Sequence, residues 1–266
     1  MAVVEEVDQL RAELQRQISE LEEQEDGVRA GDAEALHKFR VATRRSRALL
    51  RPCSGVDELQ QELRWLAGLL GPVRDLDVLI DHVRELVKEL GDDQAGGEAI
   101  VNALEAQRSQ ARADLLAALD DPRYQELLAR FRSDIETLGE TQQGHLVAVA
   151  RRELKRLRQA HADLGPNPAD GELHRVRIKA KRTRYAAEIA GKPLAKLAKA
   201  AKKLQDEIGV HQDAVVAEER VREVAKGKSL LAAGRIVERE RERRLEVRAK
   251  LPKVWKQLER AASKAF

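Results

Sequence analysis

The sequence contains one cysteine, Cys53, and no apolar stretch long enough to cross a bilayer. A single cysteine excludes an internal disulfide, and such low usage is typical of proteins that fold in a reducing cytoplasm. A membrane-spanning helix needs about 20 apolar residues, whereas charged residues interrupt every apolar stretch here. The N-terminus is acidic and lacks the basic start and apolar stretch of a signal peptide. We therefore expect a cytoplasmic protein without a membrane segment, with Cys53 as a small core residue.

Catalytic motifs are also missing. The Gly227-Lys228-Ser229 triplet matches only the end of a phosphate-binding loop, since Arg222 stands where that motif requires glycine. We find no His-Glu-x-x-His pair, no cysteine cluster, and no carboxylate set with two-metal spacing that repeats along the chain. We therefore expect a protein that is not an enzyme, with no catalytic residues, no metal site and no cofactor.

Aromatic residues make up only 3% of the chain, while charged residues make up 36%. The scarcity of aromatics argues against base-stacking platforms for single-stranded nucleic acid. A composition dominated by Ala, Leu, Glu, Lys and Arg, with apolar residues at helical spacing and no alternating strand pattern, predicts an all-α fold. The net charge of +3 is too small to attract polyanions in bulk, so a basic site requires segregation of charge.

Glycine and proline residues divide the helical pattern into segments, which predicts ten to twelve helices. The expected breaks are at Gly31, Pro52, Gly71-Pro72, Gly91, Gly96-Gly97, Asp121-Pro122, Gly139, Gly165 to Pro168, Gly191 to Pro193, Gly209, Gly227 and Pro252.

The sequence contains an internal repeat. Residues 36–47 align without a gap with residues 173–184 at an offset of 137, and residues 70–75 align with residues 208–213 at an offset of 138. Two matched blocks in the same order indicate duplication.

The duplication places a boundary near Gly139 and predicts repeats of about 1–138 and 139–266. Each repeat is expected to form a helical bundle, and the two bundles are expected to be related by a pseudo-twofold axis.

Each copy of the first block contains a helix with one cationic side. In the first helix the cationic residues fall within an arc of about 80°, opposite an apolar side that includes Phe39 and Ala42. No acid occurs in residues 35–56 or 173–187, so we expect these cations to lack local neutralisation. Solvated arginines, or arginines paired with acids of another helix, are the alternative, but duplication at matching positions favours binding. The two sets are His37, Arg40, Arg44, Arg47 and Arg51, and His174, Arg177, Lys181 and Arg184.

The histidines are assigned hydrogen-bond donor roles, with a helix-capping or core position as the alternative. Asp75 and Asp213 follow the glycine in both copies of the second block, which predicts salt bridging to an adjacent helix or helix capping. A lysine stripe follows the second basic helix, and the turn between them could fold the stripe back beside Arg177. The stripe comprises Lys192, Lys196, Lys199 and Lys203.

The twice-present pattern His-x-x-Arg-Val/Ile-x-x-Arg/Lys-Arg-x-Arg, each time followed by a glycine-bounded Asp block, resembles the CHAD family, the conserved histidine α-helical domain. The resemblance covers residues 1–266 as a single CHAD domain. It implies two pseudo-twofold-related helical bundles around a basic central groove that binds inorganic polyphosphate, and association of some members with polyphosphate granules. The implied binding residues are His37, Arg40, Arg44, Arg45, Arg47 and Arg51 with His174, Arg177, Lys181, Arg182 and Arg184, and a secondary set is Lys199, Lys202 and Lys203.

Two other functions fit the same charge pattern. Arginines that bind polyphosphate also bind a sugar-phosphate backbone, so a reader of duplex nucleic acid is the less favoured alternative. A helical scaffold could instead recruit proteins through charged surfaces such as residues 238–243, although that run is typical of a solvated helix.

Overall fold

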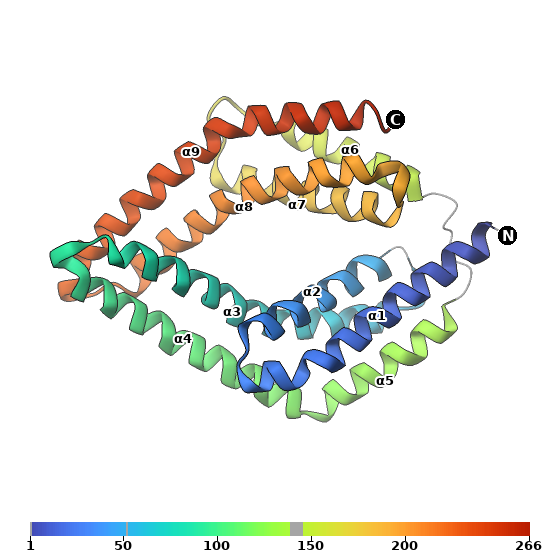
Figure 1. The fold of residues 1–266 in the computed structure, drawn as a ribbon, viewed down its shortest axis with the longest axis horizontal. Coiled ribbons are helices and arrows are strands. Elements are labelled where there is room, and N and C mark those ends of the chain that lie inside the picture. Colours follow the sequence, from blue (N-terminus) through green and yellow to red (C-terminus); the bar gives the residue numbers. More distant parts are fainter. Residues whose placement is uncertain (1, 52, 139–145) are drawn as a thin grey trace. The chain divides into compact units, whose positions relative to one another are not determined.

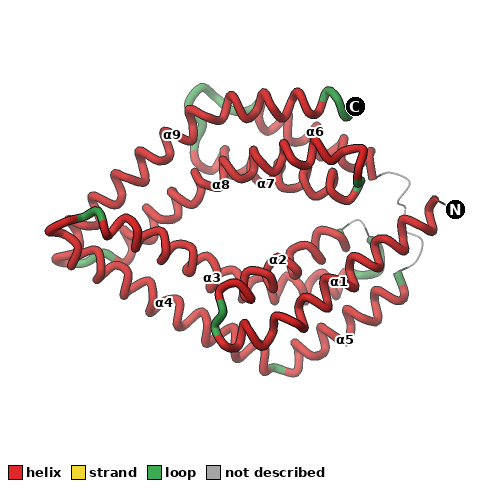
Figure 2. Tube along the Cα trace, viewed as in Figure 1, coloured by secondary structure: helices red, strands yellow, loops and turns green. Residues whose placement is uncertain are grey.

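The structure is a computed structural model that describes residues 2–51, 53–138 and 146–266, and all regular elements in these ranges are helices (Figures 1 and 2). The predicted all-α fold is confirmed. None of the described helices has the length and apolar character needed to cross a membrane. The elements are α1 (Ala2–Ala30), α2 (Ala33–Leu50), α3 (Asp57–Lys88), η1 (Gly91–Asp93), α4 (Gln94–Asp120), α5 (Pro122–Thr137), α6 (Leu146–Ala162), α7 (Asp170–Ile189), η2 (Lys192–Leu194), α8 (Ala195–Val224), η3 (Gly227–Ser229) and α9 (Leu230–Ala262).

The described ranges contain nine α-helices and three short 3-10 helices, and several of the predicted breaks do not occur. α3 continues through Gly71 and Pro72, α4 through Gly96 and Gly97, α8 through Gly209 and α9 through Pro252, so the breaks predicted there are wrong. An interior proline removes one backbone hydrogen bond, but the packing of a long amphipathic helix offsets that local loss. Breaks do occur at glycines with a positive φ angle, including Gly31 at 87°.

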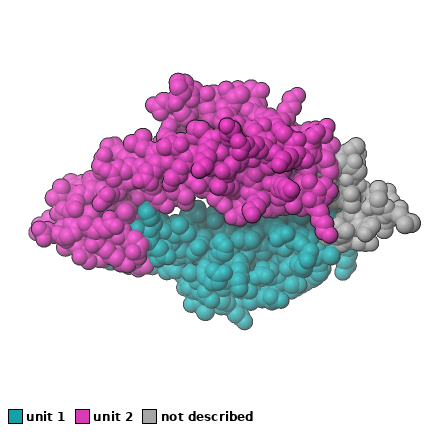
Figure 3. Space-filling view, turned by 45° about the horizontal axis from the view of Figure 1, so that its top comes forward, with its two compact units in different colours: residues 1–82, 101–144 teal, residues 83–100, 145–266 magenta. Residues whose placement is uncertain are grey.

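The described chain forms two compact units, which Figure 3 distinguishes by colour. Unit 1 comprises residues 1–82 and 101–144, and unit 2 comprises residues 83–100 and 145–266. The predicted boundary near Gly139 lies outside the described residues. The duplication, its pseudo-twofold axis and a central groove stay predictions.

In unit 1, α2 packs against α1, and α1 also packs against α5. Gly27 permits a close approach of α1 and α2, because a Cβ atom there would lie 2.5 Å from the Cβ atom of Ala35. The rings of Phe39 and Tyr124 are fully buried with their centroids 6.4 Å apart. The Asp32 side chain caps α2 by accepting hydrogen bonds from two backbone N–H groups of its first turn. These contacts fix the orientation of α2 in unit 1.

In unit 2, α6, α7, α8 and α9 pack in sequence, each against the next. Val176, Ala180 and Ala187 bury the apolar side of α7, and Leu197 and Leu204 of α8 belong to the same core. Burial of one side of α7 leaves its opposite side available for polar side chains.

Cys53 is buried, as predicted, and its thiol lies against the carbonyl oxygen of Leu49 at 3.6 Å. Burial raises the pKa of this thiol to about 11. The side chain is therefore a protonated core residue at neutral pH.

Candidate functional site

The cationic side of α2 is oriented as its sequence predicts. Phe39 and Ala42 are buried, whereas His37 and Arg51 are exposed and the arginines between them are partly exposed. We call this surface the α2 face and define it by His37, Arg40, Arg44, Arg47 and Arg51.

Two arginines of α2 have acidic partners on neighbouring helices. Arg40 pairs with Asp75 of α3 at 2.9 Å, and Arg45 pairs with Glu13 of α1 at 2.8 Å. Neither partner lies on α2 itself, so these two pairs match the alternative in which arginines pair with acids of another helix. The predicted salt bridge of Asp75 is confirmed, while the capping alternative is wrong because Asp75 lies in the middle of α3.

The remaining arginines of the α2 face make no ion pair with any residue that the structure describes. The Nε atom of Arg44 is buried without a hydrogen-bond partner among those residues. Arg47 is partly buried, and its pKa is lowered first by burial and second by the charge of Arg64 on α3. The α2 face therefore retains cations without a local counter-charge.

The corresponding side of α7 begins at His174. Its Nδ1 atom donates a hydrogen bond to the Oε1 atom of Gln212 on α8 at 3.1 Å, because an amide oxygen can only accept. The guanidinium of Arg177 lies over Gly209, with its Nε atom 3.5 Å from the position that a Cβ would take. Lys181 and Arg182 are partly exposed. We call this surface the α7 face and define it by His174, Arg177, Lys181 and Arg184.

Arg184 of the α7 face is held by several side chains. Its Nε atom donates to Glu188 at 2.9 Å, its Nη1 atom donates to Gln205 at 3.2 Å, and its guanidinium stacks over the Tyr185 ring at 4.6 Å. The side chain is only 14% exposed. Arg184 therefore already has an acidic partner, which contradicts the expectation that it lacks one.

The lysines of α8 lie on different sides of the helix. α8 folds back on α7, as the sequence suggested, and the contact of Arg177 with Gly209 marks the side of α8 that lies against α7. At 100° per residue, Lys203 lies about 120° from that side, whereas Lys202 lies about 20° from it. Lys202 pairs with Asp206 at 2.6 Å, while Lys199 and Lys203 are exposed.

A buried polar cluster supports the start of α7, and the sequence reasoning missed it. His211 is fully buried and its Nε2 atom accepts a hydrogen bond from Arg248 at 3.1 Å. Arg248 and Arg244 of α9 both bind the Asp170 carboxylate, at 2.7 and 2.9 Å. Burial and the charge of Arg248 lower the pKa of His211, so the ring is neutral.

This cluster fixes the position of His174. The cluster joins the first turn of α7 to α8 and α9, and Gln212, the partner of His174, follows His211 directly in the sequence. The available signal was the second repeat block, in which His211 takes the position of Val73 and Gln212 that of Arg74. Its connection to Arg248 joins residues 37 positions apart, which no local pattern reveals.

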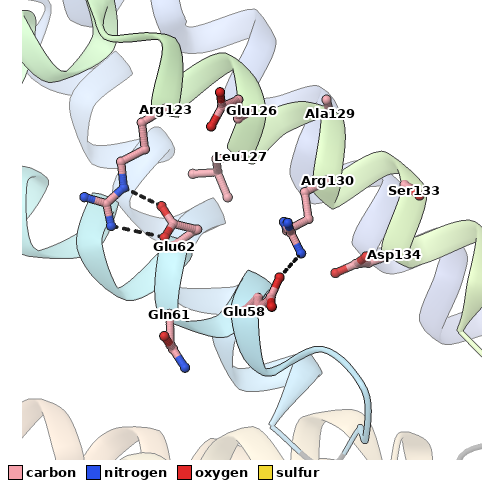
Figure 4. A pocket seen from close by; sticks show the side chains of 10 residues that line it. All are labelled: Glu58, Gln61, Glu62, Arg123, Glu126, Leu127, Ala129, Arg130, Ser133 and Asp134. Atoms are coloured by element: carbon pink, nitrogen blue, oxygen red, sulfur yellow. Dashed lines mark hydrogen bonds and ion pairs between the residues drawn. The ribbon is translucent and has the colours of Figure 1, made fainter.

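A cavity of about 1030 Å³ lies between α3 and α5 and does not include the α2 face (Figure 4). Its arginines are paired, Arg123 with Glu62 at 2.6 Å and Arg130 with Glu58. Among the described residues, no group of three or more His, Cys, Asp or Glu residues could hold a metal ion.

Comparison with known proteins identifies the family of this chain and several proteins that are similar to it. A family model described as CHAD domain matches residues 12–222. Two uncharacterized proteins of Mycobacterium tuberculosis, MT2285 of strain CDC 1551 and Rv2226 of strain H37Rv, are each 28% identical over 277 residues, covering 94% of this chain and 54% of the relative. The chain thus spans about half the length of these curated relatives.

Two solved structures share the fold. PptA from Streptomyces chartreusis superposes with a TM-score of 0.76 at 20% sequence identity, covering 94% of this chain and 99% of that one. The CHAD domain from the plant Ricinus communis superposes with a TM-score of 0.64 at 25% identity, covering 97% of this chain and 91% of that one.

Proposed function

Since the chain belongs to the CHAD domain family, we propose that it binds inorganic polyphosphate through the α2 and α7 faces and catalyses no reaction on it. One observation carries this proposal. Two helices whose residues match at an offset of 137 each bury an apolar side in the core of their own unit and turn a histidine and several cations away from it.

Arginine-rich faces of this kind suit a phosphate chain. A guanidinium donates two parallel hydrogen bonds to neighbouring oxygens of one phosphoryl group, and a row of guanidinium groups can follow a row of phosphoryl groups. Along the α2 face, residues 37 to 51 span about 21 Å at 1.5 Å per residue. A chain-like polyanion can therefore contact several cations of one helix, whereas a single phosphate can contact only one or two.

The internal ion pairs separate the candidate cations into two groups. The Arg40–Asp75 pair is exposed, with Arg40 at 32% and Asp75 at 64%, so exchanging the carboxylate for a phosphate costs little. In the pair of Arg45 the Glu13 side chain is only 16% exposed, and in the pair of Arg184 the arginine itself is only 14% exposed. Lys202 lies outside both faces and pairs with Asp206 of its own helix. On these grounds we exclude Arg45, Arg184 and Lys202 and keep the other members of the α2 and α7 faces in the assignment.

Charge reversal tests the assignment. Replacing Arg40, Arg44, Arg177 and Lys181 by Glu should abolish binding of long-chain polyphosphate while the far-ultraviolet circular dichroism stays unchanged. A matched control reverses four exposed cations of α6 and α9, namely Arg152, Lys250, Lys253 and Lys256. This control should retain binding, and equal loss in both proteins would show that net charge alone is responsible.

Ligand identity requires a competition at fixed ionic strength. Long-chain polyphosphate, duplex DNA and RNA are compared at matched phosphate concentration, because all three release counterions on binding. We expect polyphosphate to displace both nucleic acids. Preference for either nucleic acid would overturn the proposed ligand in favour of a backbone reader.

The same proposal places the protein in the cytoplasm at polyphosphate granules. A fluorescently tagged chain should colocalise with granules in cells that accumulate polyphosphate, and the fourfold Glu variant should be diffuse. Equal localisation of both proteins would contradict this part of the proposal.

A further inference from the structure

Unit 1 contains a second arginine side chain beside the α2 face, Arg64 of α3. It is exposed and makes no ion pair with any residue in the described ranges. Its charge is the second cause, after burial, of the lowered pKa of Arg47. The inference below rests on the proposed binding of polyphosphate and concerns how the two units share it.

The register of α2 and α3 places Arg64 next to the C-terminal part of the α2 face. The Gln60 side chain donates a hydrogen bond to the carbonyl oxygen of Leu50 at 3.1 Å, and Asp75 pairs with Arg40 at 2.9 Å. The two contacts show that the helices run antiparallel. Gln60, Arg64 and Asp75 share one side of α3 within an arc of about 60°.

Two glycines occupy the same side of α3 between Arg64 and Asp75. A Cβ atom at Gly68 or Gly71 would meet no heavy atom within 4 Å. The space over these two glycines is therefore open, and phosphoryl oxygens can approach the cations from this side of α3.

Acids near the N-terminal end of α3 are engaged elsewhere. Glu58 pairs with Arg130, and Glu62 pairs with Arg123 of α5, which lowers the pKa of Glu62 (Figure 4). These carboxylates face the cavity between α3 and α5 and not α2. They consequently do not neutralise Arg64.

Unit 2 carries acids at the matching positions. At the offset of 138, Lys202 corresponds to Arg64 and Asp206 corresponds to Gly68, and these two residues of α8 pair at 2.6 Å. At the offset of 137, Arg184 corresponds to Arg47 and Glu188 to Arg51.

Arg184 and Glu188 of α7 pair at 2.9 Å. Arg184 and Lys202, the counterparts of Arg47 and Arg64, are thus each paired with an acid of their own helix.

We propose that Arg47 and Arg64 together bind one phosphoryl group of the polyphosphate chain, and that unit 2 lacks this subsite because Glu188 and Asp206 neutralise its counterparts. Two guanidinium groups provide donors on two sides of one phosphoryl group, whose negative charge offsets the repulsion between them. Unit 1 is therefore the stronger binding unit.

The test compares the two counterparts. Arg64→Gln and Lys202→Gln remove one positive charge each from matching positions, and Arg152→Gln removes one from an exposed position on α6. For long-chain polyphosphate, Arg64→Gln should weaken binding about fivefold to twentyfold and reduce the slope of log K against log salt by about 0.7 to 0.9. The other two variants should stay within about twofold of the wild type.

A second pair of variants moves the acid between units. Gly68→Asp places a carboxylate where unit 2 has Asp206, and it should weaken binding as much as Arg64→Gln. Gly68→Asn has nearly the same size without the charge, so it measures the effect of filling this open space, and it should weaken binding less than Gly68→Asp does.

The outcomes separate the two proposals. Equal effects of Arg64→Gln and Lys202→Gln in a protein that binds polyphosphate would overturn the subsite and leave the proposed function standing. A wild-type protein that fails to bind polyphosphate would overturn both.

Discussion

Releasing Arg40 from its internal partner should strengthen binding. In the free protein the Arg40 guanidinium donates to Asp75 at 2.9 Å, so a phosphate must displace the carboxylate before it can take that position. Asp75→Asn keeps the size and the packing of the side chain and removes its charge. We therefore expect Asp75→Asn to bind polyphosphate more tightly than the wild type.

The structure limits the size of this gain. Asp75 is 64% exposed and Arg40 is 32% exposed, and ion pairs at such exposure contribute about 0 to 1 kcal/mol after screening by solvent. An energy of 1 kcal/mol corresponds to about a fivefold change in affinity, so the gain is at most about fivefold. The slope of log K against log salt should steepen by about 0.7 to 0.9, because one more cation exchanges counterions for phosphate.

Unit 1 offers a matched control for this experiment. Asp120 pairs with Arg29 at 2.5 Å with nearly the same exposures, 68% and 31%, but lies outside the α2 face. Titration calorimetry at several salt concentrations should show a gain for Asp75→Asn that exceeds the gain for Asp120→Asn. Equal gains would reduce the effect to net charge, and a loss in Asp75→Asn would show that Asp75 positions Arg40 for binding.

Three further predictions concern stability and reactivity. Gly27→Ala should lower the free energy of unfolding by about 1 to 3 kcal/mol in urea because its Cβ would clash with α2, whereas Gly234→Ala, which faces open space in α9, should raise it by about 0.5 to 1 kcal/mol. The folded state lowers the pKa of His211, so the unfolded chain binds more protons below about pH 6.5 and stability should fall as the pH decreases through that value. His211→Gln should flatten this slope, and an unchanged slope would assign it to other groups. Cys53, with its pKa raised to about 11, should react with a thiol reagent at pH 8 only as fast as the protein unfolds.

The sequence predicted the features that depend on local periodicity. Helical spacing identified the all-α fold, and the arcs of α2 and α7 placed Phe39 and Val176 in the cores and His37 on the surface. These predictions succeed because the side that a helical residue faces follows from its position at 100° per residue.

The sequence did not predict where long helices continue. Gly71-Pro72, Gly209 and Pro252 are breaks by local propensity, yet α3, α8 and α9 pass through them. A single unfavourable residue costs a few kcal/mol at most, and the packing of a helix of about 30 residues exceeds that cost. Propensity therefore fails where the stabilising contacts come from distant parts of the chain.

The expected lack of local neutralisation fails at Arg184, whose acidic partner Glu188 lies four residues further along the same helix, just beyond the acid-free segment. This failure carries the most functional weight. The motif assigns equivalent roles to Arg47 and Arg184, but Arg184 is bound by Glu188 and Gln205 while Arg47 has a second arginine beside it. A polyanion gains most from cations without a counter-charge, because binding an already paired cation first requires breaking an existing contact. Matching positions in the two segments thus do not have matching surroundings, and the acids around a cation determine whether it is available to a ligand.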